Sequence, residues 1–379
     1  MPAFGAAISE HPVGAQAIGE VIGSVVEQTG TAPDLALLFV RGHDPDAIAD
    51  MAAAICSLLQ PRVLAASTAL AVVGGSYEAE QGTAISLWAG RVGEVEAVRL
   101  ATAESAEGTA VVGMPDSAAL GPRTLLLLAD PFTFPSDAFL RATNEQYPNL
   151  RVLGGVASAP GGPGANRLAL GQRMYHDGAV GVLLPAGIGE ISVVSQGCRP
   201  VGQPLIVTDA AGNRLRTLGS QPATQRLSEV VERSSYRDRE LLSSAIHLGV
   251  AVDESLAEFK RGDFLIRGML GVDHTDASLR VGTRLEVGTT VQFHVRDASS
   301  ATQDLEGTLA EIDADAALLF TGSARGHRLF DEPDHDARRV QQAVGGGPVA
   351  GMFCGGEFGP IADKNHVHGS SATALFFYV

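Results

Sequence analysis

The chain has 379 residues, more than one hydrophobic core usually holds, which predicts two domains. Hydrophobic residues make up 45% and charged residues 18%, as in globular proteins, and the net charge of −16 disfavours nucleic acid and anionic lipid as partners. We find no apolar run near the ~20 residues of a membrane-spanning helix and no secretory signal, so we expect a cytoplasmic protein without membrane partners.

The first part of the chain alternates helical and strand patterns. Apolar residues recur at helical spacing over residues 13–28, and a buried strand is predicted over 34–40. A helix with Asp44 as its N-cap is predicted over 44–60, and a second strand over 62–67. The order strand, helix, strand is typical of a βαβ unit.

The same order returns twice further along the chain. The second copy is predicted over 124–130, 136–148 and 150–155, and the third over 316–322, 331–347 and 348–356. The three copies end on the comparable apolar segments VLAAS, VLGGV and VAGMF. We therefore predict an internal repeat of a strand–helix–strand unit.

Between the second and third copies the hydrophobic period changes to two, which is typical of antiparallel strands. The predicted strands are 179–185, 191–197, 204–209, 213–218, 249–254, 263–270 and 290–297. A polar helix over 227–246 is expected to begin the second domain. The predicted fold class is mixed α/β (α+β), with repeated βαβ units at both ends, antiparallel strands between them, and two intimately packed domains.

A glycine-rich stretch over 152–167 includes Gly154 and Gly155 and follows a predicted strand. It lacks the G-x-x-x-x-G-K-[ST] pattern of a phosphate-binding loop, and a chain with 45 glycines forms short Gly-x-Gly patterns by chance. A loop in which glycines adopt positive φ is the stronger interpretation, and we expect no cofactor.

The segment VAGMFCGGEFGP, residues 349–360, places Cys354 where a nucleophile elbow would hold its nucleophile. His368 could serve as the base and Glu357 as the orienting group. The Gly-Pro pair that follows argues against a helix after the turn, and without a helix the thiol pKa is not lowered. The three cysteines are far apart and match neither zinc nor disulfide spacing, so a buried structural cysteine is the default.

In NHVHGSS, His366 and His368 would point to one face of a strand, as in a histidine metal pair. No third ligand is identifiable from the spacing, so we predict no metal site, and hydrogen-bonded histidines are the preferred interpretation.

Two arginines stand next to predicted strand ends. Arg325, in GSARGHRLF, could clamp a carboxylate or phosphate, or could pair with Asp331 or Glu332. Gln196 and Arg199, in SQGCRPVG, could contact a ligand or belong to a structural turn. Both alternatives stay open in each case.

Several collinear motifs together resemble the FIST family (F-box and intracellular signal transduction proteins). The segments ALLFTGSARGHRLF, GPVAGMFCGGEFGPI and NHVHGSSATALFF are similar to the FIST C domain, as are SQGCRPVGQPLIVT and RGDFLIRGMLGVD. The segments DLALLFV, SYEAEQGTAISL, DPFTFPSDAFL and VLGGVASA resemble the FIST N domain. The resemblance covers roughly residues 30–379.

The resemblance implies a sensory, signal-transduction module that binds a small ligand, such as an amino acid or related metabolite. It divides the chain into a helical extension (1–29), a FIST N-like domain (30–225) and a FIST C-like domain (226–379). No kinase, receiver or cyclase segment is evident, so a stand-alone bacterial-type sensor is expected. Departures from the family pattern, such as Gly322 in place of a cysteine and Val367 in place of a phenylalanine, weaken any implied thiol chemistry.

Because strand ends of one βαβ unit face the same edge of a sheet, we expect Arg325 and Glu357 to lie together at the rim of a crevice. There Arg325 would hold the carboxylate and Glu357 the ammonium of a zwitterion. The expected ligand-binding residues are Arg325, Gly326, Gly356, Glu357, His368, Gln196, Arg199, Gly154 and Gly155.

Two other functions compete with the sensor. The first is a scaffold that docks a protein partner or a second copy of the chain, for which the helix over 13–28 is the best candidate. The second is a hydrolase or transferase that uses Cys354 with His368. We rank the sensor first, and an enzyme is disfavoured.

Overall fold

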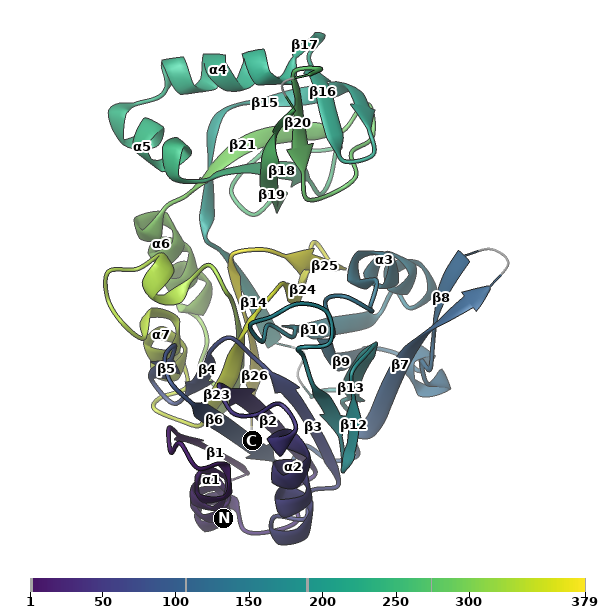
Figure 1. The fold of residues 1–379 in the computed structure, drawn as a ribbon, viewed down its shortest axis with the longest axis vertical. Helices are drawn as coiled ribbons and strands as arrows, with labels where there is room; N and C mark the ends of the chain where they lie inside the picture. The colour runs from purple at the N-terminus through teal and green to yellow at the C-terminus, as the bar shows by residue number, and fades with distance from the viewer. Residues whose placement is uncertain (1–2, 106–107, 189–190, 274, 379) are drawn as a thin grey trace. The chain divides into compact units, whose positions relative to one another are not determined.

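The computed structural model describes residues 3–105, 108–188, 191–273 and 275–378. The chain forms two compact units (Figure 1). Unit 1 comprises Met1–Val194, Leu305–Val367 and Ser371–Val379, and unit 2 comprises Ser195–Asp304 and His368–Ser370. The mixed α+β class predicted from the sequence is confirmed. None of the helices in the described residues is long and apolar enough to span a membrane.

The helices of unit 1 are α1 (Gly14–Thr29), α2 (Ala47–Leu58), α3 (Ser136–Gln146) and α7 (His335–Ala343), with the short 3-10 helices η1 (Asp116–Ala119) and η2 (Gly326–Arg328). Unit 2 holds α4 (Ala223–Arg233) and α5 (Tyr236–Ser244). Helix α6 (Ala298–Leu309) begins in unit 2 and ends in unit 1.

Unit 1 is built from three sheets. The first has the order β1 (Phe4–Ser9), β6 (Ala84–Gly90), β2 (Leu35–Arg41), β3 (Val63–Thr68), β11 (Leu168–Leu170) and β12 (Arg173–Tyr175). The second has the order β25 (Lys364–His368), β24 (Glu357–Ile361), β10 (Leu150–Val156), β9 (Arg123–Ala129), β13 (Ala179–Leu183), β7 (Glu96–Ser105) and β8 (Gly108–Val112). The third has the order β14 (Ile191–Gln196), β26 (Ser371–Phe377), β22 (Ala316–Gly322), β23 (Val349–Cys354), β4 (Val72–Gly74) and β5 (Tyr77–Ala79).

One pattern recurs in all three sheets and confirms the predicted repeat. Each sheet contains a parallel strand pair, β2–β3, β9–β10 or β22–β23, joined by α2, α3 or α7 respectively. An antiparallel strand flanks the first member of each pair (β6, β13 or β26), and another flanks the second member (β11, β24 or β4).

The repeats exchange hairpins in a cycle. The hairpin β4–β5 follows β3 along the chain but pairs with β23 of the third repeat, where Gly74 is opposite Ala350. In the same way β11 follows β10 and pairs with β3, and β24 follows β23 and pairs with β10. Each sheet is therefore completed by a strand from another repeat, so the three repeats depend on one another to cover their edges.

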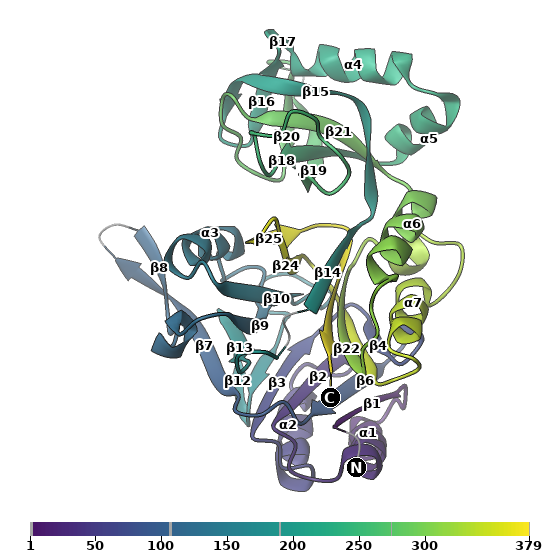
Figure 2. The same cartoon turned by 180° about the vertical axis from the view of Figure 1, so that it is seen from behind.

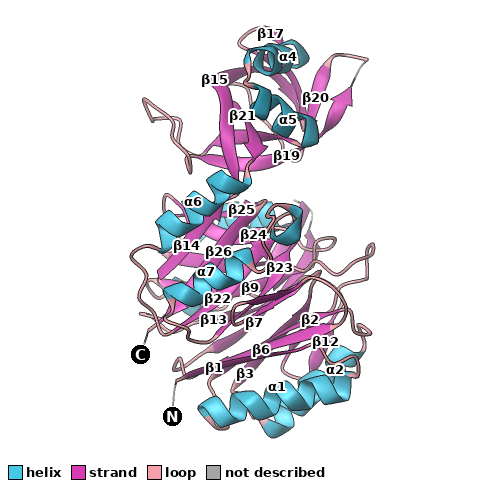
Figure 3. Cartoon of the chain, turned by 90° about the vertical axis from the view of Figure 1, so that its left-hand side faces the viewer, coloured by secondary structure: helices cyan, strands magenta, loops and turns pink. Residues whose placement is uncertain are grey.

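The inner faces of the three sheets share one apolar core, which includes Leu37, Leu126, Leu153, Phe320 and Met352. The outer faces are covered by helices, as Figure 3 shows for α1 and α2 below the first sheet. Helix α7 and the end of α6 cover the third sheet, and α3 covers the second. The strands of the parallel pairs are buried on both faces, which explains their nearly continuous apolar runs.

Unit 2 is an antiparallel sheet closed on itself. Its order is β15 (Cys198–Ala211), β21 (Thr290–Arg296), β18 (Ile246–Ala251), β19 (Phe264–Asp273), β20 (Ser278–Val281), β16 (Arg214–Leu218) and β17 (Gln221–Pro222). Because β15 also pairs with β16, these strands form a ring around a core that includes Leu215, Leu248 and Phe293. Helices α4 and α5 lie beside this ring (Figure 2).

Some element boundaries differ from the prediction. The helix expected over 227–246 is two helices, because Ser235 interrupts it and caps α5 by accepting a hydrogen bond from the N–H of Asp238 (3.1 Å). The helix expected over 331–347 is the shorter α7, because Asp334 adopts a left-handed φ of 60° just before it. Helix α2 begins at Ala47, later than predicted, and the Asp44 side chain accepts a hydrogen bond from the N–H of Asp46 (3.0 Å) just before it.

The compact units are defined by packing, and the division into residues 1–29, 30–225 and 226–379, which follows the resemblance, stays a prediction. Strand β1 pairs with β6, and α1 packs against the first sheet, so residues of the expected 1–29 extension are part of unit 1. Unit 2 draws on both sides of the expected boundary between residues 225 and 226.

Candidate functional site

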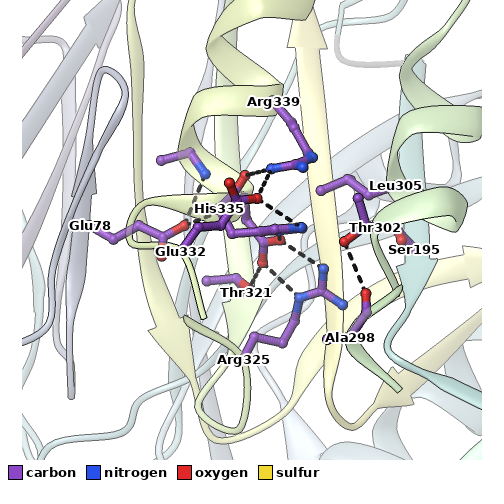
Figure 4. A network of polar contacts seen from close by, with 12 residues as sticks. Glu78, Ser195, Ala298, Thr302, Leu305, Thr321, Arg325, Glu332, His335 and Arg339 are labelled. Carbon is purple, nitrogen blue, oxygen red and sulfur yellow. Dashed lines mark hydrogen bonds and ion pairs between the residues drawn. The ribbon is translucent and has the colours of Figure 1, made fainter. Parts of the chain in front are cut away.

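Arg325, the strongest sequence candidate, lies in the loop after β22 and is completely buried (Figure 4). Its Nε and Nη2 atoms donate to the two carboxylate oxygens of Asp336 at 2.6 Å and 2.7 Å. Thr321 Oγ1 donates to the same carboxylate at 2.6 Å. Of the two open interpretations, the geometry fits an internal ion pair, but its partner is Asp336 in α7, not Asp331 or Glu332.

The exchanged hairpin supplies a second carboxylate to this site. Glu78 in β5 accepts hydrogen bonds from the N–H groups of Asp336 (3.0 Å) and Ala337 (2.9 Å), so the first repeat caps the helix of the third. Burial raises the pKa of Glu78 well above its usual value, and the charge of Asp336 adds to this shift. Burial alone would also raise the pKa of Asp336, but Arg325 more than offsets that and holds it well below its usual range.

The side chain of Glu80 lies so close to residue 326 that only glycine fits there. The Glu80 carboxylate accepts a hydrogen bond from the N–H of His327 (2.8 Å) and contacts the His327 ring. A Cβ atom on Gly326 would lie 2.5 Å from Glu80 Oε1, and the φ of Gly326 is +57°. The position therefore needs glycine for both space and backbone conformation.

Glu357 lies inside unit 1, which corrects the expectation that it stands at the rim of a crevice. Its Oε2 atom accepts hydrogen bonds from the N–H (3.0 Å) and the hydroxyl (2.6 Å) of Ser371. Burial raises its pKa to about 8, against the opposing effects of Ser371 and of the Arg325 charge. Arg325 and Glu357 thus influence each other electrostatically, but both are shielded from solvent.

The glycines expected near the ligand serve the packing of strand ends. Gly154 and Gly155 in β10 lie opposite Phe358 and Glu357 in β24. A Cβ atom on Gly155 would lie 2.3 Å from the Sγ atom of Cys354. The carbonyl of Gly356 accepts a hydrogen bond from the N–H of Val156 at 2.8 Å.

Cys354 is fully buried at the end of β23, and burial raises its pKa well above its usual value. The next element is strand β24, so no helix N-terminus stabilises a thiolate here. His368, at the end of β25, is buried and belongs to unit 2. Throughout residues 3–105, 108–188, 191–273 and 275–378, no group of three or more His, Cys, Asp or Glu side chains is arranged to hold a metal ion.

In unit 2 the two candidates Gln196 and Arg199 have different surroundings. Gln196 is buried, and its side-chain amide donates to the carbonyl of Phe264 at 2.7 Å, which is a structural contact. Arg199 donates from Nε to Asp297 at 2.6 Å and from Nη2 to Asp238. It also lines a cavity of about 480 Å³ between β15, α4 and the start of α5.

The cavity lies beside an irregular part of β15. The pairing of β15 with β21 shifts register between Val201 and Leu205, which is the signature of a bulge. Gly202, with a φ of +75°, brings the strand close to α4, since its Cβ would lie 2.9 Å from Val230. The cavity is lined by Arg199, Pro200, Val201, Gly202, Gln203, Leu205, Arg226, Glu229, Val230, Arg233, Ser234, Ser235 and Asp238.

Sequence reasoning identified Arg199 but missed Arg226 and Arg233. These arginines lie on α4, in a polar segment that resembles an ordinary solvated helix face. The available signal was two arginines seven residues apart, which places them about two turns apart on one face of a helix. Their meeting with Arg199 depends on the packing of α4 on β15.

Comparison with known proteins accounts for nearly the whole chain. The family model of the FIST N domain matches residues 34–221, and that of the FIST C domain matches residues 223–360. An uncharacterized protein of Mycobacterium bovis is 39% identical over 383 residues, which cover 99% of this chain and 98% of that protein. An uncharacterized protein of Mycobacterium tuberculosis is 38% identical over 382 residues, 99% of each chain.

Proposed function

Since the chain belongs to the FIST family, whose domains are sensory domains of signal transduction, we propose that it is a sensory module that binds a small ligand in the cavity of unit 2. The candidate ligands are amino acids and related metabolites, and the signal passes to a protein partner. The observation that carries this proposal is the arginine-lined cavity of about 480 Å³. Its volume lies within the roughly 300–1,000 Å³ of small-molecule sites.

The unit 2 cavity is a better candidate than the surroundings of Arg325. The guanidinium of Arg325 is buried and already holds the carboxylate of Asp336. Arg233, in contrast, is exposed at the cavity and makes no hydrogen bond or ion pair within the described residues. Apolar side chains such as Val201 and Val230 lie beside it, so the cavity offers both a charge and an apolar surface.

A cytoplasmic location belongs to the same proposal. It is supported by the small, odd number and wide spacing of the cysteines, Cys56, Cys198 and Cys354, which are typical of a reducing compartment.

A thermal-shift screen tests the proposal. The purified chain is heated with amino acids, small carboxylates and nucleotides, next to the Arg233→Gln and Arg239→Gln variants. Arg239 is an exposed arginine on α5 outside the cavity, so its variant is the matched control. A ligand at ~100 times its Kd stabilises the native state by about 2.7 kcal/mol.

The proposal predicts a compound that raises Tm in the parent and in Arg239→Gln, but not in Arg233→Gln. If no compound raises Tm in any of the three proteins, the small-ligand sensor is contradicted and the scaffold becomes the leading alternative. A compound that stabilises all three equally binds elsewhere and contradicts the location.

A further inference from the structure

We propose that the cavity of unit 2 selects a monocarboxylate with an aliphatic body, in preference to a zwitterionic amino acid or a phosphate. The inference rests on the proposed function, because it assumes that this cavity is the ligand site. It narrows the chemical class of the ligand on the basis of the charges and apolar side chains that line the cavity.

The side chains that line the cavity carry one net positive charge, because three arginines lie there with one glutamate and one aspartate. Arg226 pairs with Glu229 at 2.9 Å. Arg199 pairs with Asp238 and, behind the cavity, with Asp297. Asp297 is also held by Arg237 at 3.0 Å, so these two arginines and two aspartates balance one another. The charge of Arg233 acts on Glu229, but Arg233 makes no ion pair within the described residues, so it is the cation that a ligand anion can pair with.

The same pairs disfavour an ammonium group. An amino acid would need a carboxylate to receive its ammonium, and the two carboxylates at the cavity already accept from arginines. The hydrogen bond from Arg226 lowers the pKa of Glu229, and the one from Arg199 lowers the pKa of Asp238, so both stay ionised and paired. An ammonium would therefore share a carboxylate with an arginine, and like charges next to each other repel.

A phosphate dianion fits no better. Its second negative charge would find no unpaired cation among the lining side chains and would lie near Glu229 and Asp238, where like charges repel. A single carboxylate matches both the charge of Arg233 and the flat fork of its donors.

The remaining lining favours an aliphatic body. Pro200, Val201, Leu205 and Val230 present apolar surface from β15 and α4 to the same cavity. Each methylene group that is buried against such a surface raises affinity about fourfold. Affinity should therefore rise with chain length until the cavity is filled.

Isothermal titration of the full chain at constant ionic strength tests the class. The probes are acetate, butyrate and hexanoate, with norleucine as the amino acid of the same skeleton, hexylamine as the oppositely charged analogue, and inorganic phosphate. We expect affinity to rise from acetate to hexanoate, to fall at least tenfold from hexanoate to norleucine, and to vanish for hexylamine and phosphate.

The same titration is repeated with two variants. Arg233→Gln should bind hexanoate at least tenfold more weakly than the parent, and Arg239→Gln should bind it equally well. Circular dichroism and Tm verify that both variants are folded.

The outcomes separate the ligand class from the proposed function. Norleucine or phosphate binding more tightly than hexanoate, with loss of affinity in Arg233→Gln, overturns the monocarboxylate class and leaves the sensor site intact. Hexanoate binding that Arg233→Gln does not weaken overturns the role of Arg233. Failure of every probe here and of every compound in the thermal screen overturns the sensor site and the ligand class together.

Discussion

Arg325 and Asp336 form an ion pair through two hydrogen bonds, with both side chains shielded from solvent. The pair joins the loop after β22 to the first turn of α7, and Glu78 from the exchanged hairpin caps the same turn. A buried pair of this kind adds little net stability over apolar packing, but removing one partner leaves an uncompensated buried charge. The pair therefore fixes the loop to the helix within the third repeat, and Glu78 joins that helix to the hairpin of the first.

Replacing Arg325 with methionine should destabilise the chain by about 3–5 kcal/mol, because Asp336 would then be ionised and buried without its cation. Urea unfolding of the parent and the variant measures the difference. Arg338→Ala is the matched control, since Arg338 is an exposed residue of α7 that pairs with Asp334 just before the helix, and its loss should cost below about 1 kcal/mol. Equal losses in the two variants would contradict this account of the buried pair.

Glu357 should make stability depend on pH. Its folded pKa of about 8 lies above the ordinary value of 4.5, so the native state holds the proton more tightly than the unfolded state does. The stabilisation from this group is complete below pH 4.5 and is lost as the pH rises to about 8, at a slope of up to about 1.4 kcal/mol per pH unit.

Glu357→Gln removes this proton and should gain stability relative to the parent as the pH rises from 5 to about 8. Unfolding free energies at several pH values give the comparison, and Glu78 is present in both proteins, so the difference isolates Glu357. Glu94→Gln is the control, because Glu94 is exposed, and its curve of unfolding free energy against pH should run parallel to that of the parent. A Glu357→Gln curve that also runs parallel to the parent would show that Glu357 is ionised in the fold.

Gly326→Ala should destabilise the chain more than Gly171→Ala does. Both glycines have φ near +60°, but a Cβ at Gly171 meets no atom within 4 Å, whereas one at Gly326 displaces the Glu80 carboxylate. Loss of the hydrogen bond from His327 to Glu80 should add about 1 kcal/mol or more to the backbone strain that both variants share. Thermal unfolding of the two variants measures the loss of stability of each. Equal losses would mean that the Glu80 side chain can move aside, and would contradict this prediction.

Cys354 should resist alkylation in the native protein. It is fully buried with a raised pKa, whereas Cys56 is half-buried on α2. Iodoacetamide followed by peptide mass analysis should label Cys56 first and label Cys354 only after unfolding. Fast labelling of Cys354 at neutral pH would revive the Cys354-dependent hydrolase or transferase.

The local parts of the fold were predictable from the sequence, and the way they join was not. The strands that end at Thr68, Val156 and Cys354 have long apolar runs, which reveal βαβ units without further information. The hairpin exchange joins Gly74 to Ala350, far apart along the chain, and periodicity says nothing about such pairings.

The candidate sites show the same limit of local patterns. Arg325 stood out beside a strand end, but the segment after it offers several acidic residues, and only the start of α7 selects Asp336 over Asp331 and Glu332. Arg199 was visible in a turn-rich segment, whereas Arg233 became relevant only once α4 packed on the bulge of β15.

The most direct test of the central claim is a crystal structure of the full chain grown with hexanoate. We predict hexanoate in the cavity of unit 2, with a carboxylate oxygen within about 2.7–3.2 Å of the Arg233 guanidinium and the aliphatic chain against Val201 and Val230. Hexanoate bound at another site, with this cavity holding only water, would contradict the claim that unit 2 is the sensing unit of the chain.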